Sequence, residues 1–272
     1  MVNGFMPKSL KEALDIRSNY DVVPYGGGTD LMIEGQKDVN YLFLNKVPEM
    51  KCIVEDEEYI RIGGSCTFTE VLESEIIPEI MKQAVSKIAA PAIRNSGTMA
   101  GNIGNGSAKA DSVLIEYVTD AKIVLASASN TRIVKIDDFY KGRKELDLGK
   151  DELIVEILLP KIGLENYYYK KIGARNALAI SRVSFAGIIK IDDERIKDIA
   201  IAFGAVSGTV LRFKELEKMM IGKTLLEASE IKEDFIDAYK QKIIPTKGRV
   251  SAEYRKRVCI NLIKDFLNEK GI

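Results

Sequence analysis

The feature that most constrains this chain is a glycine-rich stretch at residues 94–111, which reads Arg-Asn-Ser-Gly-Thr-Met-Ala-Gly-Asn-Ile-Gly-Asn-Gly-Ser-Ala-Lys-Ala-Asp. Glycine allows the backbone to turn at positive φ or to approach a partner closely. Backbone N–H groups interleaved with short hydroxyl and amide side chains are typical of a phosphate or nucleotide cradle. The stretch therefore predicts a binding loop, and an ordinary Gly/Asn connection between two helices is the alternative.

A second stretch of the same kind lies earlier in the chain. Residues 22–25 have the pattern of a short buried strand, and they are followed by Gly-Gly-Gly-Thr-Asp at residues 26–30. No Gly-Lys-Ser/Thr follows, so this is not a P-loop, and the G-x-G-x-x-G dinucleotide fingerprint is absent. Two glycine-rich loops, each beside an apolar segment, favour a ligand that is held from both sides. We expect residues 26–30 and 98–106 to bind a diphosphate through their backbone N–H groups.

Charge and composition exclude several classes of protein. The 272 residues contain 40 Lys+Arg and 40 Asp+Glu, so bulk charge favours neither nucleic acid nor a membrane surface. No apolar run approaches the roughly 18–20 residues of a membrane span, and the first residues do not resemble a signal peptide. A cytoplasmic protein of two domains is expected.

The chain contains no histidine and only three cysteines, which lack C-x-x-C spacing. This composition excludes a Ser-His-Asp triad, histidine metal ligands and flavin attached through histidine, and it argues against a zinc or iron–sulfur site. We therefore predict no metal site and no catalytic acid or base, and any flavin should be held noncovalently.

Hydrophobic periodicity predicts an α+β protein. The expected helices cover residues 9–18, 78–90, 111–118, 211–220, 225–241 and a final segment after Ser251. The expected strands cover residues 22–25, 41–44, 59–63, 121–125, 131–136, 151–159, 167–172, 182–191 and 196–206. Pro160 and Gly163 interrupt the pattern, so a domain boundary is expected at residues 160–166.

The two glycine-rich motifs resemble those of a known family. Residues 24–31 are similar to the first flavin loop, usually Ala-Gly-Gly-Thr-Asp-Leu, of the FAD-binding medium subunits of the xanthine dehydrogenase and carbon monoxide dehydrogenase family. Residues 93–111 resemble its second loop, in which an aspartate follows the asparagine by nine residues, as Asp111 follows Asn102 here. The segments 5–14 and 251–255 resemble the opening and closing motifs of the family, so the likeness extends over nearly the whole chain.

The resemblance implies a fold and a division of the chain. Residues 1–162 would form a two-part FAD-binding domain of the vanillyl-alcohol-oxidase/PCMH type, with subdomains at about 1–55 and 56–162. Residues 163–272 would form a C-terminal domain, a three-stranded antiparallel sheet with helices.

It also implies a set of cofactor-binding residues. The set comprises Tyr25, Gly26, Gly27, Gly28, Thr29, Asp30, Leu31, Ile88, Thr98, Gly101, Asn102, Asn105, Asp111, Leu158 and Lys170. Several members have a structural alternative: a helix cap for Asp30 and Asp111, helix core for Ile88, a tight turn for Asn102 and a solvated side chain for Lys170. The chain departs from the family where Ala179 and Ser181 replace the usual aspartate and alanine.

The function implied by the resemblance is electron transfer through noncovalent FAD. A molybdenum-cofactor subunit of the same complex would oxidise the substrate, and an iron–sulfur subunit with [2Fe–2S] clusters would pass electrons to this FAD and on to NAD or another acceptor. Two alternatives stay open: a stand-alone flavin-dependent oxidoreductase and a flavin-free assembly subunit. Bound flavin would exclude the last, and copurifying partner subunits would exclude a stand-alone enzyme.

Overall fold

A computed structural model describes residues 4–35, 38–161 and 163–272. The chain divides into two compact units. Unit 1 comprises Met1–Pro78, Ile88–Ser107 and Asp120–Lys161, and unit 2 comprises Glu79–Lys87, Ala108–Thr119 and Ile162–Ile272. The predicted division of the chain into two domains at residue 162 stays a prediction. The contacts assign two earlier segments, Glu79–Lys87 and Ala108–Thr119, to the second unit.

Unit 1 begins with a small parallel sheet in the order β1-β3-β2. Its strands are β1 (Gly4–Phe5), β2 (Val22–Tyr25) and β3 (Asn40–Phe43), with α1 (Leu10–Asn19) between the first two in sequence. Ser9 caps α1, because its hydroxyl accepts a hydrogen bond from the Glu12 backbone N–H at 3.2 Å. The strand β2 leads into residues 26–30 and then into the short helix α2 (Leu31–Glu34).

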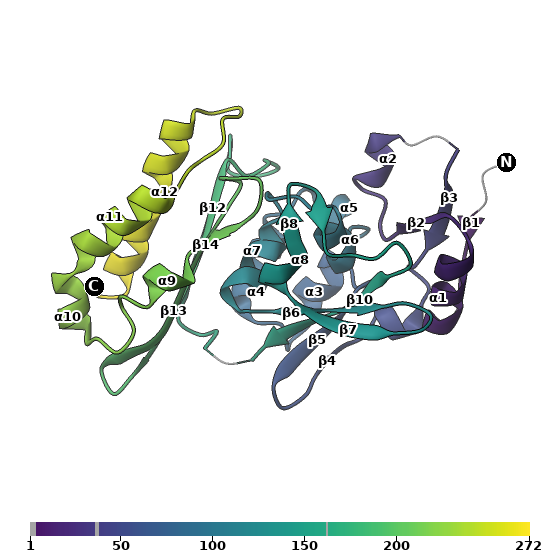
Figure 1. Cartoon of the computed structure of the whole chain (residues 1–272), viewed down its shortest axis with the longest axis horizontal. Helices are drawn as coiled ribbons and strands as arrows, with labels where there is room; N and C mark the ends of the chain where they lie inside the picture. Colours follow the sequence, from purple (N-terminus) through teal and green to yellow (C-terminus); the bar gives the residue numbers. More distant parts are fainter. Residues whose placement is uncertain (1–3, 36–37, 162) are drawn as a thin grey trace. The chain divides into compact units, whose positions relative to one another are not determined.

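The second sheet of unit 1 is antiparallel, with strand order β4-β5-β10-β6-β7 (Figure 1). Its strands are β4 (Ile53–Glu55), β5 (Tyr59–Gly63), β6 (Lys122–Ala126), β7 (Thr131–Lys135) and β10 (Leu153–Pro160). Its short elements are η1 (Pro48–Met50), α3 (Phe68–Glu73), α5 (Pro91–Arg94), α6 (Met99–Gly104), α8 (Ile136–Phe139), β8 (Tyr140–Gly142) and β9 (Glu145–Leu146). The helix α6 contacts β10 and β5, which places the second glycine-rich stretch on this sheet.

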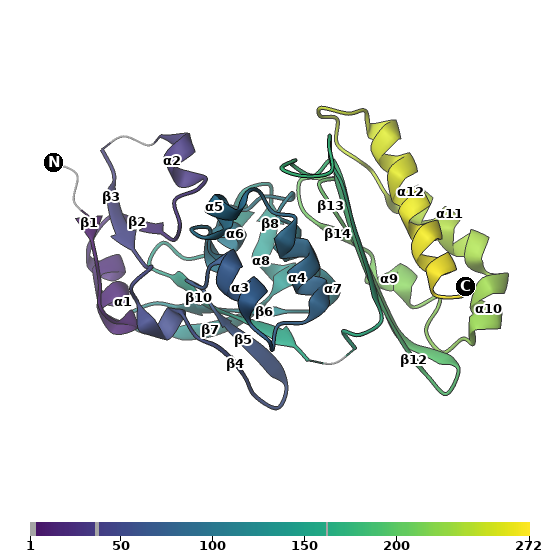
Figure 2. The same cartoon turned by 180° about the vertical axis from the view of Figure 1, so that it is seen from behind.

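Unit 2 is built on a four-stranded antiparallel sheet in the order β11-β12-β13-β14. The strands are β11 (Tyr167–Ile172), β12 (Val183–Asp192), β13 (Arg195–Gly204) and β14 (Leu211–Arg212), and the helices are α4 (Glu79–Ser86), α7 (Asp111–Val118), α9 (Lys214–Glu217), α10 (Leu225–Glu230), α11 (Lys232–Lys242) and α12 (Ala252–Glu269). Both faces are covered: α4 and α7 pack on one face, and α11 and α12 lie on the other (Figures 1 and 2). Residues 183–189 of β12 are accordingly buried without alternation.

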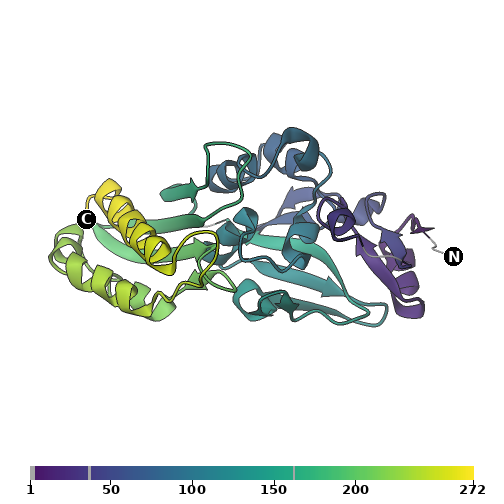
Figure 3. The same cartoon turned by 90° about the horizontal axis from the view of Figure 1, so that it is seen from above.

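The core of unit 2 contains a cluster of aromatic side chains among aliphatic ones. The rings of Phe185 and Phe203 lie 5.3 Å apart, and those of Phe185 and Phe266 lie 5.7 Å apart. Burying one such side chain contributes about 1.5–3 kcal/mol. The helices that cover this core, α11 and α12, run side by side (Figure 3, green-yellow and yellow).

The structure confirms the predicted α+β class and an antiparallel sheet with helices in the C-terminal part. Three predicted helices are wrong in extent, and the one expected at 225–241 is divided into α10 and α11 at Ile231. The helix expected at 78–90 ends at Ser86, because Ala89 adopts φ 43° and Pro91 begins α5 instead of ending a helix. The helix expected at 211–220 is only α9, since residues 211–212 pair with β13 and add a fourth strand to a sheet expected to have three.

No helix among the described residues is both long and apolar enough to cross a membrane.

Candidate functional site

Unit 1 contains a pocket of about 380 Å³ between its two glycine-rich segments. We call residues 26–30 the first loop and residues 96–106 the second loop. The predicted residues that line the pocket are Gly26, Gly27, Gly28, Thr29, Asp30, Leu31, Thr98, Gly101, Asn102 and Asn105. The fold therefore brings most of the predicted site residues of unit 1 to one cavity, whose size is that of an ordinary small-molecule site.

The backbone N–H groups of the first loop are unused. Among the hydrogen bonds of the described residues, none is donated by the backbone of residues 26–30. These residues are half-buried or at the pocket edge, and all five line the cavity. Because partly buried amides without partners are costly, this loop favours a ligand rich in acceptor atoms.

The second loop differs, because most of its N–H groups are already bonded. It is largely the helix α6, capped by Thr98, whose hydroxyl accepts from the Gly101 N–H at 3.1 Å. The N–H of Met99 donates to Cys66 O at 3.0 Å, and that of Ala100 donates to Gly64 O at 3.0 Å. These amides are not free to bind a diphosphate, contrary to what the sequence suggested for residues 98–106.

The two loops touch each other through glycine. A Cβ atom on Gly27 would lie 1.8 Å from the carbonyl oxygen of Ser96, and one on Gly26 would lie 2.4 Å from the Thr98 hydroxyl. Gly28 adopts φ +68°, and a Cβ there would lie 2.1 Å from the hydroxyl of Tyr25. The triple glycine is therefore needed for loop contact as well as for open access to a ligand.

Polar side chains also join the two loops. Asn105 donates a hydrogen bond from Nδ2 to Oδ2 of Asp30 at 2.9 Å. Asp30 occupies the N-cap position of α2, but its carboxylate makes no cap hydrogen bond, so the capping alternative is wrong for this side chain. Nearby, Lys144 Nζ and Glu34 Oε1 form an ion pair of 2.6 Å.

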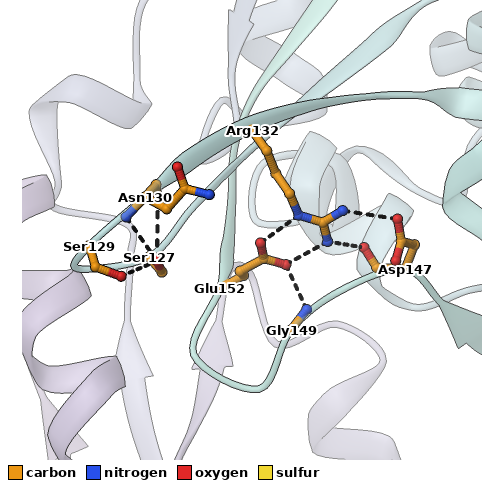
Figure 4. Close-up of polar contacts among 7 residues, drawn as sticks. All are labelled: Ser127, Ser129, Asn130, Arg132, Asp147, Gly149 and Glu152. Carbon is orange, nitrogen blue, oxygen red and sulfur yellow. Dashed lines mark hydrogen bonds and ion pairs between the residues drawn. The ribbon is translucent and has the colours of Figure 1, made fainter.

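One wall of the pocket is held by Arg132 of β7 (Figure 4). Its Nε donates to Glu152 Oε1 at 2.6 Å and its NH1 donates to Asp147 Oδ2 at 3.0 Å. The Gly149 N–H donates to the same Glu152 carboxylate at 2.6 Å. These bonds hold the pKa of Glu152 below its usual range, with Arg132 as the main cause. The hydrogen bonds of Arg132 and Gly149 hold residues 147–152 in place, and of these Leu148 and Glu152 line the pocket.

Some lining residues were not predicted from the sequence. Arg17, in the last turn of α1, lines the pocket and donates from NH1 to the carbonyl of Val22. Leu153 and Ile154 of β10 also line the cavity. The sequence contained a signal that could have indicated Arg17 as a site residue. It is a basic residue in the last turn of the helix that precedes the strand leading into the first loop.

Three predicted residues of unit 1 lie outside the pocket lining. Leu158 is buried in the core of unit 1. Ile88 follows α4, so the helix-core alternative is wrong, and its carbonyl accepts from Arg94 NH1 at 2.7 Å. Tyr25 packs its ring on Phe43, with centroids 4.7 Å apart, and lies against Gly28. Contact of these three side chains with a cofactor stays a prediction.

Asp111 belongs to unit 2, where its carboxylate is buried and fully paired. Lys171 Nζ lies 2.8 Å from Oδ2, and Ser181 Oγ donates to Oδ1 at 2.8 Å, while the Asp111 side chain is 3% exposed. The N-cap of α7 is Ala110, so the capping alternative for Asp111 is wrong. The predicted residue Lys170 is exposed on β11. Its neighbour Lys171, also on β11, is the lysine that contacts the Asp111 carboxylate.

The pocket of unit 1 fits a nucleotide cofactor. It combines unused backbone donors, a guanidinium and glycines without side chains, which together match the acceptor oxygens of a diphosphate. Among the described residues, no group of three or more side chains has the composition of a metal site.

Comparisons with known proteins agree with this geometry. Residues 1–162 match the family model described as the FAD binding domain in molybdopterin dehydrogenase, and residues 167–270 match the CO dehydrogenase flavoprotein C-terminal domain. The FAD-subunit of nicotinate dehydrogenase from Eubacterium barkeri is 32% identical over 237 residues, which are 81% of this chain and 80% of the relative. The medium chain of glyceraldehyde dehydrogenase from Sulfolobus acidocaldarius is 30% identical over 260 residues, 92% of either chain.

The fold is also that of solved structures. A chain of the carbon monoxide dehydrogenase from Hydrogenophaga pseudoflava superimposes with a TM-score of 0.90 at 24% identity, covering 98% of this chain and 96% of that one. With the two family models spanning almost the whole sequence, the chain belongs to the family of FAD-binding medium subunits of the xanthine dehydrogenase and carbon monoxide dehydrogenase type, and it is an FAD-dependent oxidoreductase subunit whose cofactor is FAD.

Proposed function

We propose that this chain is the electron-transfer subunit of a molybdenum hydroxylase complex. It would receive electrons from the [2Fe–2S] clusters of an iron–sulfur subunit and pass them, through noncovalent FAD, to NAD or another acceptor. A molybdenum-cofactor subunit of the same complex would oxidise the substrate. Relatives named as FAD-subunit or medium chain of dehydrogenases support this assignment.

The observation that carries the proposal is the set of unused N–H groups in the first loop. We assign these donors to the diphosphate of FAD, with Thr29 beside them. Bound FAD would supply the electron-transfer chemistry, because a flavin can take up and release electrons. The residues of this chain bind the cofactor, orient it and set the charge around it.

The charged groups of the pocket support a subunit over a stand-alone enzyme. Glu34 and Glu152 each have a cationic partner, and Asp30 accepts from Asn105. None of these carboxylates is poised as the base that a flavin oxidase acting on its own substrate would need. The unused amides, in turn, argue against an assembly subunit that has lost the flavin.

A cytoplasmic location is part of the proposal. The three cysteines, Cys52, Cys66 and Cys259, are all free thiols, which suits a reducing compartment.

The test is purification of the chain from its native host under gentle conditions. We expect a yellow protein with the visible absorption of flavin, release of FAD on heating as identified by mass spectrometry, and copurification of iron–sulfur and molybdenum subunits. A flavin-containing protein that carries no partner and reduces an acceptor with its own substrate would support the stand-alone alternative. A colourless protein that takes up no added FAD would refute the placement of FAD in this pocket.

A further inference from the structure

We propose that Arg17 binds the diphosphate of FAD in the pocket of unit 1 and sets the preference of the chain for FAD over flavins without a diphosphate. This inference rests on the placement of FAD proposed above. It concerns a residue outside both glycine-rich segments, on the helix α1.

The position of Arg17 is fixed by the sequence around it. It lies in the last turn of α1, and the chain returns through β2 directly to the first loop. The guanidinium donates from NH1 to the carbonyl of Val22, the first residue of β2. This bond holds the side chain along the strand that carries the first loop, and Arg17 lines the pocket together with Val23 and Pro24.

Most of the donors of Arg17 remain available. A guanidinium has five N–H donors, and Val22 takes one of them. The Nε atom is buried and has no hydrogen-bond partner within the described part of the chain. Burial also lowers the pKa of Arg17, against the opposing effect of Asp21 and Asp151. A half-buried cation with unused donors is stabilised by any anion that can reach it.

Arg17 is the cation of the pocket lining that forms no ion pair with a described residue. Five charged side chains line the pocket, namely Arg17, Asp30, Glu34, Lys144 and Glu152. Lys144 pairs with Glu34 at 2.6 Å, and Glu152 pairs with Arg132 at 2.6 Å. Among the described residues no carboxylate lies within ion-pair distance of Arg17. The Asp30 carboxylate would repel an anion in the pocket, and Arg17, which forms no ion pair there, is the cation that would offset this repulsion.

The ligand chemistry follows from the two sets of donors. Arg17 offers a planar fork of N–H groups, and the first loop offers backbone N–H groups on the same cavity. Both kinds of donor suit phosphate oxygens. The diphosphate is the anionic group of FAD, whereas riboflavin has none. Arg17 should therefore contribute to the binding of FAD and not to that of riboflavin.

The experiment measures the dissociation constants of FAD and riboflavin for the flavin-free full chain by flavin fluorescence, at low and high salt. For Arg17→Gln we expect the FAD dissociation constant to rise roughly 10- to 100-fold, as for loss of a charged hydrogen-bond donor, and the riboflavin constant to stay unchanged. FAD binding by the variant should also depend less on salt. Arg17→Lys keeps the charge without the fork, so it should retain part of the preference.

Arg61→Gln serves as the matched control, because it removes the same charge from unit 1 outside the pocket lining and should leave both constants unchanged. The ratio of the two constants does not depend on the folded fraction, so it stays informative if Arg17→Gln lowers stability. An unchanged ratio in folded Arg17→Gln would overturn the role of Arg17 alone. If the wild-type chain bound no FAD, the proposed function would fail, and this inference with it.

Discussion

The pocket of unit 1 and the Asp111 site of unit 2 hold the two sets of polar residues that the sequence assigned to one cofactor, and they differ in how far their hydrogen bonds are satisfied. In the pocket, the first-loop amides and most donors of Arg17 have no partner among the described residues. Around Asp111, both carboxylate oxygens are bonded, one to Lys171 and one to Ser181. Lys171 also donates to the carbonyl of Lys87 at 2.7 Å.

The difference separates two uses of polar chemistry. A buried polar group whose partners all come from the chain stabilises the fold, and removing one partner leaves the other unsatisfied. A partly buried polar group that borders a cavity without a partner lowers the stability of the fold, and it gains its partner when a ligand binds. The hypothesis that follows is that substitutions at the Asp111 site change stability first, whereas substitutions in the pocket change affinity first.

The largest effect is expected at the ion pair of Asp111. Lys171→Met should lower the free energy of unfolding by about 3–5 kcal/mol, because it leaves a carboxylate that is 3% exposed without its cation. Lys170→Met is the matched control on the same strand. Since Lys170 is exposed, this change should stay within about 0.5 kcal/mol. Urea denaturation measures both values, and equal stability of the two variants would break the comparison.

The next largest effect on stability is expected at Glu116, a buried carboxyl of unit 2 that differs from Asp111 in its contacts. Its carboxyl is fully buried on α7, neither oxygen has a partner within the described part of the chain, and burial raises its pKa to about 8. The folded state therefore keeps a proton that the unfolded state releases near pH 4–5. The contribution of Glu116 to stability should be greatest below that range and should fall by on the order of a few kcal/mol as the pH rises to about 8.

Glu116→Gln should remove most of this slope, since glutamine does not titrate. The chain has no histidine, so few other groups change charge in the same range. Denaturation curves at pH 5, 6.5 and 8 would test the prediction. A wild-type stability that is flat across this range would show that Glu116 is ionised or paired in the folded protein.

Gly27→Ala tests the contact between the two loops of the pocket. The new methyl group would lie 1.8 Å from a backbone oxygen of the second loop, so one loop must move. We expect a stability loss of about 1–3 kcal/mol and a rise of roughly 10- to 100-fold in the FAD dissociation constant. Gly104→Ala is the matched control on the same pocket, because the new methyl group would lie 3.6 Å from Cδ1 of Ile154, an ordinary van der Waals contact. Equal FAD affinity in the two variants would refute the need for close loop contact.

The smallest effect is expected for Arg132→Gln. The side chain of Arg132 is 34% exposed, so its network should contribute only about 1 kcal/mol to stability. Hydrogen exchange should speed up at residues 147–152, and FAD affinity should fall a few-fold. Because Arg132 holds the pKa of Glu152 low, its contribution is present at neutral pH and is lost as the pH falls through the Glu152 titration. Lys135→Gln, an exposed change on the same strand, should alter neither quantity.

Local signals in the sequence predicted much of the fold. Ser9 and Ser251 cap α1 and α12, and periodicity located β2, β5 and β11 to within a residue. The class, the family and FAD as cofactor were also predicted correctly. These features depend on residues that are neighbours in the chain, so a single sequence contains them.

Features that depend on packing between distant segments were missed. The role of Lys170 beside the flavin, which the resemblance implied, stays a prediction, but the single sequence did not indicate that Lys171, on the other face of β11, pairs with Asp111. Likewise, the sequence did not indicate that Leu153 and Ile154 line the pocket, and cofactor contact by Leu158 of the same strand stays a prediction. A glycine-rich motif also could not reveal that α6 uses its own amides.

The contact between the two loops has a consequence for how the cofactor is acquired. The first loop is synthesised early. The residues that it contacts, Ser96 and Thr98, come much later in the chain, and so does the segment 147–152 that Arg132 binds. A nascent chain that ends before residue 152 cannot complete the cavity. Flavin should therefore enter only after unit 1 has been fully synthesised and folded, and a bound flavin would mark those chains that have passed this stage.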